Sequence, residues 1–161
     1  MSNNTLVILG AGQQGRNCHR LAPINGYQTV AFVDDFITDP VEDIRVYSKI
    51  EDIPDFMDHK YIVAVGDLAV RKKFIEQINL LGLECANLID PTADIEPGAK
   101  IGTGNYIYKF VSVYASATIG NHNIINCKAV LATDSVIGNN CNICMGSNIC
   151  GAVHVGDNSY I

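Results

Sequence analysis

In the C-terminal half of the chain, aliphatic residues recur at every sixth position. They are Ile95, Ile101, Ile107, Val113, Ile119, Ile125, Leu131, Ile137, Ile143, Ile149, Val155 and Ile161, and a small or compact residue follows four places after nearly all of them. A period of six fits neither a helix of 3.6 residues per turn nor a plain alternating strand. It fits short strands joined by tight corners, where glycine adopts angles that other residues resist. The pattern therefore predicts a parallel β-helix.

A second period of 18 residues lies over the first. Pairs of an aliphatic residue and a glycine stand at 101–102, 119–120, 137–138 and 155–156. Three hexads therefore form one coil, and successive coils stack at about 4.8 Å, so that residue i lies against residue i+18. Residues 92–161 are predicted to form a triangular β-helix, although the period alone does not indicate its hand.

Before residue 92, short apolar runs alternate with helical segments. Strands are predicted at 5–10, 28–35, 61–67 and 84–90, and helices at 13–24, 48–57 and 68–81. This alternation favours a small parallel sheet of the doubly wound α/β type. Asp90-Pro91 is expected to end the domain, because the residue before a proline is held extended. The sequence thus predicts a Rossmann-like half-domain at 1–91 and an all-β domain at 92–161.

Composition and charge argue against several classes of binding partner. A formal net charge of −6 and a pI near 5.0 argue against nucleic acid or an anionic membrane as a partner. The sequence shows neither a membrane-spanning apolar run nor a signal-peptide pattern, so we expect a cytoplasmic location without membrane insertion. No two of the β-helix cysteines are one coil apart, and we interpret Cys141-x-x-Cys144 as structural thiols, with no metal site.

A glycine loop, Gly10-Ala11-Gly12-Gln13-Gln14-Gly15, connects the first predicted strand to the first predicted helix. Its glycines allow a tight turn and let backbone N–H groups approach a phosphate. Asp34 and Asp35 follow the second strand, where acids meet a ribose or a base. Half a dinucleotide fold suits a mononucleotide-type ligand better than NAD. The alternative is that the loop is only a tight structural turn.

These motifs occur together with Val65-Gly66-Asp67-x-x-x-Arg71, Asn87-Leu88-Ile89-Asp90-Pro91 and the hexads. The whole chain resembles the sialic-acid O-acetyltransferase and bacillosamine N-acetyltransferase family of left-handed β-helix acyltransferases. The resemblance implies a homotrimer that transfers acetyl groups from acetyl-CoA to a sialic-acid-type sugar or a UDP-amino sugar in surface-glycan synthesis. The sugar-nucleotide contacts it implies are Gly10, Gly12, Gln13, Gln14, Gly15, Asp34, Asp35, Gly66 and Arg71, and the acetyl-CoA contacts are Gly151 and Ala152.

The chain departs from this family where relatives carry a histidine as general base. Thr133 occupies the histidine position, the neighbouring acid is kept as Asp134, and Asn142 stands where some relatives have a second histidine. Threonine has no useful basicity near neutral pH, so we expect impaired transfer from a catalytic site at these three positions. Relatives also continue for further coils beyond the hexad that begins at Ile161, and the β-helix is therefore expected to lack its C-terminal coils.

Two other interpretations stay open. The chain could be a non-catalytic, sugar-nucleotide-binding member of the same family, or an NAD-binding sensor module with a structural β-helix. The four histidines are expected to have surface or structural roles, unless a neighbouring subunit brings His122 or His154 to the site. An aromatic cluster at Tyr106, Tyr108, Phe110 and Tyr114 favours a trimer interface, or else covers the junction with the N-terminal domain.

Overall fold

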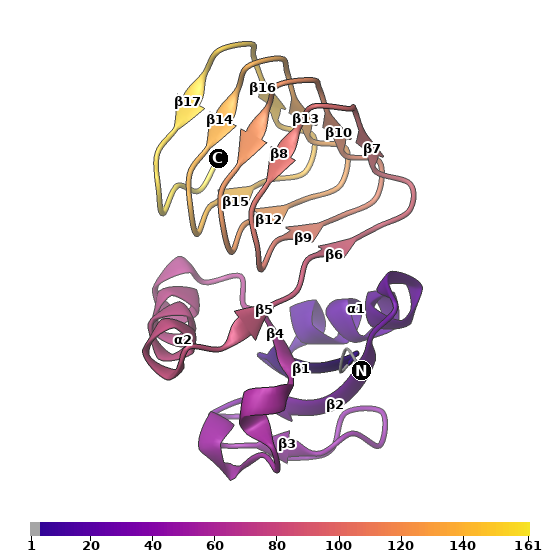
Figure 1. Cartoon of the computed structure of the whole chain (residues 1–161), viewed down its shortest axis with the longest axis vertical. Coiled ribbons are helices and arrows are strands. Elements are labelled where there is room, and N and C mark those ends of the chain that lie inside the picture. The colour runs from indigo at the N-terminus through magenta and orange to yellow at the C-terminus, as the bar shows by residue number, and fades with distance from the viewer. Residues whose placement is uncertain (1–3) are drawn as a thin grey trace. The chain divides into compact units, whose positions relative to one another are not determined.

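The computed structural model describes residues 4–161. The chain forms two compact units, and the boundary between them along the sequence lies between Ala86 and Asn87 (Figure 1). This boundary lies a few residues before the expected one at Pro91. The single strand expected over 84–90 is in fact two strands. β5 (Glu84–Cys85) belongs to the sheet of the first unit and β6 (Leu88–Ile89) to the first coil of the second, because Ile89 already lies in the hexad frame.

The first unit is a five-stranded parallel sheet with the strand order β3-β2-β1-β4-β5. Its other strands are β1 (Thr5–Leu9), β2 (Gln28–Val33), β3 (Val46–Tyr47) and β4 (Lys60–Val63), and its α-helices are α1 (Gln13–Leu21) and α2 (Leu68–Leu81). Short 3-10 helices are η1 (Ala22–Asn25), η2 (Ile50–Asp52) and η3 (Phe56–Asp58). The expected helix over 48–57 is broken at Pro54, which has no N–H to donate.

Both faces of this sheet are buried, as parallel sheets require. On one face, Val7, Val33 and Val63 pack with Ile78 of α2. On the other face, Phe32 is fully buried and its ring meets His19 of α1 edge-on, with 5.9 Å between the ring centroids. The carboxyl ends of the strands therefore open between two helical layers, where α/β sheets bind ligands.

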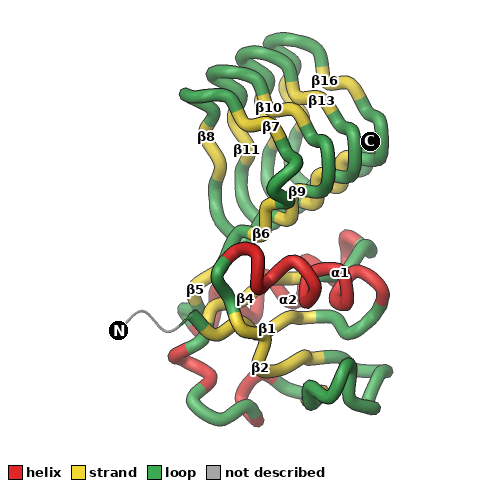
Figure 2. Tube along the Cα trace, turned by 90° about the vertical axis from the view of Figure 1, so that its right-hand side faces the viewer, coloured by secondary structure: helices red, strands yellow, loops and turns green. Residues whose placement is uncertain are grey.

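The second unit is the expected triangular parallel β-helix (Figure 2). Its three sheets, named here by their first strands, are the β6 sheet (β6, β9, β12, β15), the β7 sheet (β7, β10, β13, β16) and the β8 sheet (β8, β11, β14, β17). After β6, the strands are β7 (Asp94–Ile95), β8 (Lys100–Ile101), β9 (Tyr106–Ile107), β10 (Ser112–Val113), β11 (Thr118–Ile119), β12 (Ile124–Ile125), β13 (Val130–Leu131), β14 (Val136–Ile137), β15 (Asn142–Ile143), β16 (Asn148–Ile149) and β17 (His154–Val155).

The 18-residue register is confirmed by the strand pairing. Val113 pairs with Leu131, and Leu131 with Ile149, so that each aliphatic side chain lies over the one a coil earlier. The compact residues Ala117, Ala129 and Cys141 are fully buried beside these columns. The hexad pattern therefore specifies both the aliphatic columns and the compact residues that pack beside them in the core.

A ladder of buried asparagines runs along the corner where the β8 sheet turns into the β6 sheet, called here the β8/β6 corner. Asn105 Oδ1 accepts from the N–H of Asn123 at 2.9 Å, and Asn105 Nδ2 donates to the Gly120 carbonyl at 2.8 Å. One coil later, Asn123 accepts from the N–H of Cys141 at 2.7 Å and donates to the Gly138 carbonyl at 2.9 Å. Each amide thus satisfies two backbone groups that the corner would otherwise bury unpaired.

The ladder begins at Asn87, and at Cys141 a thiol takes the place of the asparagine amide. Asn87 accepts from the N–H of Asn105 at 2.8 Å, whereas the Cys141 thiol lies 3.2 Å from the Gly156 carbonyl. A thiol is a weaker donor than an amide. Cys141 is thus buried with a structural contact, as expected from the sequence.

Most corners use left-handed residues other than glycine, contrary to the expectation that glycine supplies these angles. Their φ values lie between 53° and 63°. The glycines at 102, 120 and 138 instead allow coils to approach closely, since a Cβ on Gly120 would lie 2.5 Å from the Gly138 carbonyl oxygen. The left-handed residues are Phe110, Ser116, His122, Lys128, Asp134, Asn140, Ala152 and Asn158.

We expect Asn123→Ala to lower the free energy of unfolding of the β-helix by about 2–4 kcal/mol, because it leaves buried groups of Cys141 and Gly138 without partners. Asn121→Ala is the control. Asn121 accepts from the N–H of Thr103 in an exposed ladder, where water can replace it, and we expect a cost below about 1 kcal/mol. Urea titration measures both costs, and equal shifts would contradict the role of the buried ladder.

Candidate functional site

The glycine loop makes a turn that only glycine allows at two of its positions. Gly10 has φ of +108°, and a Cβ there would lie 2.7 Å from the Ala64 carbonyl oxygen. A Cβ on Gly15 would collide with the Gly10 carbonyl, whereas a Cβ on Gly12 would meet nothing within 4 Å. Gly10 and Gly15 therefore shape the loop, and Gly12 keeps open the space in front of α1.

The N-terminus of α1 opens into this space without a side-chain cap. Gly12 is the N-cap residue and has an extended backbone. Gln13 is exposed and its Nε2 donates to Asn17 Oδ1, while Gln14 is half-buried. An uncapped helix N-terminus is a site for a phosphate, because its N–H groups and its dipole both favour an anion.

Asp34 supports the glycine loop from behind. Its carboxylate accepts from the N–H of Ala11 at 2.8 Å and from those of Phe36 and Ile37 at 2.9 Å. Burial alone would raise the pKa of Asp34, but these three hydrogen bonds lower it below its ordinary value. The carboxylate of Asp34 thus links the loop after β1 to the loop after β2, and these three hydrogen bonds are to backbone N–H groups.

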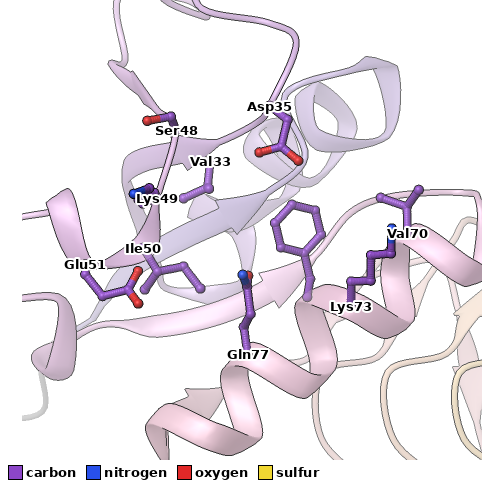
Figure 3. A pocket seen from close by; sticks show the side chains of 10 residues that line it. Val33, Asp35, Ser48, Lys49, Ile50, Glu51, Val70, Lys73 and Gln77 are labelled. Carbon is purple, nitrogen blue, oxygen red and sulfur yellow. The ribbon is translucent and has the colours of Figure 1, made fainter.

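The adjacent Asp35 lines a cavity of about 360 Å³ (Figure 3). The cavity lies beyond the end of β2 and is bounded by the segment 48–51 and by α2. Phe74 and Ile50 give it apolar walls, while Lys73 and Gln77 bring polar groups from α2. A flat heterocycle with hydrogen-bonding edges fits such a lining, which combines an aromatic face with groups of both charges.

Of the two residues expected after β4, Gly66 is exposed and Arg71 is buried. Gly66 is exposed at the end of β4, on the same sheet edge as the glycine loop. The Arg71 side chain is fully buried, and Nη1 lies 3.5 Å from the Val65 carbonyl. Arg71 therefore supports the loop after β4 from within, instead of facing a ligand.

Four of the expected acetyl-transfer residues meet at one corner of the β-helix, between the β7 and β8 sheets. The N–H of Ala152 donates to the Thr133 carbonyl at 3.0 Å, and a Cβ on Gly151 would lie 3.2 Å from the same oxygen. Thr133, Asp134, Gly151 and Ala152 are all exposed. The stacking expected from the 18-residue period therefore presents Thr133 and Asp134 to solvent, one coil from Gly151.

Asn142 does not join this group within one chain. It belongs to β15 in the β6 sheet, is buried, and its Oδ1 accepts from Asn126 Nδ2 at 2.7 Å. The β6 sheet forms the triangle side opposite the corner of Thr133. Only another subunit could bring these two residues together.

The histidines differ in how much of the ring they expose. His59 lies 2.7 Å from Thr5 Oγ1 and 3.0 Å from the Pro54 carbonyl, and His19 lies 3.5 Å from Glu42. His122 is buried at the β8/β6 corner, one coil from Gly104. His154 is exposed on β17. It is the histidine of the described chain that the fold leaves most accessible.

Sequence analysis missed the residues that line the cavity besides Asp35. Ser48 and Lys49 come from an irregular segment, and Lys73, Phe74 and Gln77 lie on one side of α2. Their only sequence signal is the spacing of 73, 74 and 77 on one helix face, which also fits an ordinary packing face. Among residues 4–161 there is no group of three or more side chains suited to hold a metal ion, and no helix is both long and apolar enough to cross a membrane.

Residues 5–78 match the family model of the PglD N-terminal domain. Over 97% of its length, the chain superposes with a TM-score of 0.90 on 76% of a mutant perosamine N-acetyltransferase from Caulobacter crescentus, at 26% identity, in a complex with CoA and GDP-perosamine. The acetyltransferase domain of PglB from Neisseria gonorrhoeae, in complex with acetyl coenzyme A, gives a TM-score of 0.81 at 24% identity, covering 98% of this chain and 87% of that one.

A similar sequence is acyl-[acyl-carrier-protein]–UDP-N-acetylglucosamine O-acyltransferase from Pseudomonas putida, 39% identical over 64 residues. The match spans 35% of this chain and only 25% of that protein. Residues 5–78 are thus similar to the PglD N-terminal domain, and nearly the whole chain shares its fold with sugar N-acetyltransferases that contain a hexapeptide β-helix. The expected fold class, with its left-handed helix, is confirmed.

We expect Asp34→Ala to lower the free energy of unfolding of the N-terminal unit by about 1–3 kcal/mol at pH 7, because three hydrogen bonds to a charged acceptor are lost. The folded pKa of Asp34 is depressed. Its contribution is therefore full above the ordinary aspartate pKa of about 3.9 and disappears as the pH falls through the lower folded value.

The control for this prediction is Asp35→Ala, which removes an exposed acid and should leave the stability nearly unchanged. Thermal unfolding of both variants between pH 7 and pH 3 tests the difference. A gap between the parent and Asp34→Ala that stays constant with pH would contradict the assignment.

Proposed function

We propose that the protein is an acetyl-CoA-dependent acetyltransferase acting on a nucleotide-linked amino sugar, or on a sialic-acid-type sugar, in the biosynthesis of a surface glycan in the cytoplasm. The observation that carries this proposal is the superposition of nearly the whole chain on a sugar N-acetyltransferase that binds CoA and a sugar nucleotide. Features of each unit, taken by itself, support the proposal.

In this proposal the N-terminal unit holds the nucleotide. The base enters the cavity beside Phe74 and Asp35, and the phosphates meet the N–H groups at the start of α1. Gly12 leaves room for the phosphates, and Asp34 holds the loop in place. Gly66 borders the phosphate site, while buried Arg71 stabilises it indirectly.

The corner of Thr133 is the proposed site of acetyl transfer. Acetyl-CoA, when bound, supplies a thioester as the acetyl donor. The N–H of Ala152 is engaged by the Thr133 carbonyl, and we assign the N–H of Gly151 to the thioester oxygen. Asp134 stands beside the reacting atoms, but Thr133 cannot remove a proton from the acceptor. Transfer is therefore slow in this chain.

We further propose a homotrimer, supported by the exposed aromatic residues of the β-helix. Phe110 and Tyr114 are 56% and 42% exposed, and such rings usually mark an interface. Tyr106 is not part of this exposed set, since it is buried and its ring centroid lies 4.1 Å from that of Tyr108. A neighbouring subunit would also bring a copy of Asn142 toward the corner of Thr133.

We expect Gly12→Val to reduce the affinity for UDP- and GDP-sugars at least tenfold without unfolding the protein, because the added side chain fills only open space in front of α1. Isothermal titration measures the affinity, with NAD as a ligand that should not bind either protein. Gly156→Val is the control, since a Cβ there also meets nothing within 4 Å. Unchanged sugar-nucleotide affinity in Gly12→Val would exclude this loop as the phosphate site.

We expect Thr133→His to raise the rate of acetyl-CoA consumption with UDP-amino sugars at least tenfold, because a general base contributes about 10²–10⁴ in rate. Thr133 is exposed, so the ring can be accommodated next to Asp134. Ala115→His is the control, since residue 115 lies in the same column one coil away. A parent chain with ordinary enzyme rates would contradict the proposed impairment, and an unchanged rate in Thr133→His would favour a non-catalytic protein.

A further inference from the structure

Acetyl transfer to an amine needs a base, and the corner of Thr133 has no imidazole of its own. His154 is exposed, belongs to the β-helix, and lies in the strand that directly follows Gly151 and Ala152. His19 and His59 belong to the other unit, and His122 is buried at a different corner. On the basis of the proposed function, we infer that His154 is the general base for the transfer that this chain retains.

The strand register places His154 beside the proposed reaction site. His154 pairs with Val136 of the preceding coil, and Asp134 lies two residues before Val136. Asp134 is the left-handed corner residue before β14, so the extended-strand rise of about 3.3 Å per residue and the strand spacing of about 4.8 Å give an upper bound of roughly 8 Å between the Cα atoms of Asp134 and His154. Aspartate and histidine side chains are long enough to span such a distance, and on this ground we assign Asp134 the role of orienting the imidazole.

The side chain of His154 faces outward from the β-helix. Val155 is buried in the core, so its neighbour in the strand faces outward, as the exposure of His154 shows. The outward column of the β8 sheet contains Val136 directly below it. The ring is therefore exposed on the outer surface of the β8 sheet, next to the corner that carries Thr133, Asp134 and Gly151.

The reaction that His154 would assist is a balanced acyl transfer. The acceptor nitrogen attacks the thioester carbon and gives up a proton to the neutral imidazole, while the carbonyl oxygen is held by the N–H of Gly151. As the C–N bond is completed and the C–S bond breaks, the imidazolium returns its proton to the departing thiolate. Asp134 stabilises the imidazolium while it exists.

The test is a pair of substitutions in two backgrounds, with steady-state acetyl-CoA consumption as the measurement. In the parent chain, His154→Gln should lower kcat at least tenfold and leave KM for both substrates unchanged. In the Thr133→His background the same substitution should have little effect, because a base then stands next to Asp134. The matched control is His122→Gln, which should change neither parameter, and melting temperatures verify that all variants are folded.

A second variant separates chemistry from structure. His154→Ala should recover part of its activity when imidazole is added to the solution, a response that a merely structural role would not give. An unchanged kcat in His154→Gln, or absent turnover in a parent that binds both substrates, would overturn the role of His154 alone. A parent that binds neither acetyl-CoA nor a sugar nucleotide would overturn the proposed function itself.

Discussion

The β-helix depends on keeping each residue in register with the one 18 positions away, and the buried asparagine ladder enforces that register. A slip of one residue would remove Asn105 and Asn123 from the backbone groups that they satisfy in the neighbouring coil. Correct register matters because the corner residues adopt an unfavourable backbone conformation, which the hydrogen bonds between coils must compensate. Each left-handed residue other than glycine costs about 1–2 kcal/mol, and hydrogen bonds between coils, such as the one from the N–H of Ala152 to the Thr133 carbonyl, offset this strain.

The same register brings the residues of the candidate transfer site together. Because each coil repeats the corner of the previous one, the backbone of Gly151 lies over the Thr133 carbonyl without any contribution from the Thr133 side chain. In the N-terminal unit, two adjacent acidic residues have different roles. Asp34 gives its oxygens to the backbone, and Asp35 faces the cavity. Two acids that look alike in sequence thus have different physical tasks.

The sequence was sufficient to predict the elements whose cause is periodic or local. The hexads gave the coils and the aliphatic columns, and the glycine loop gave the turn before α1. The burial of Arg71, the cavity beside Phe74 and the separation of Asn142 from Thr133 depend on how distant segments pack, for which no local pattern exists. The structure has two strands within 84–90 where the sequence predicts one, because one apolar run continues across two units and only the hexad frame of Ile89 marks the division.

Thr133 lies at an exposed position, where the fold does not depend on the identity of the side chain. Its carbonyl serves the coil above, whereas its hydroxyl side chain projects from the corner into solvent. Replacement of an imidazole at such a position removes a base but no packing and no inter-coil hydrogen bond. The β-helix therefore does not depend on which side chain stands at position 133, and structural similarity carries information about the scaffold without fixing which side chain moves the proton.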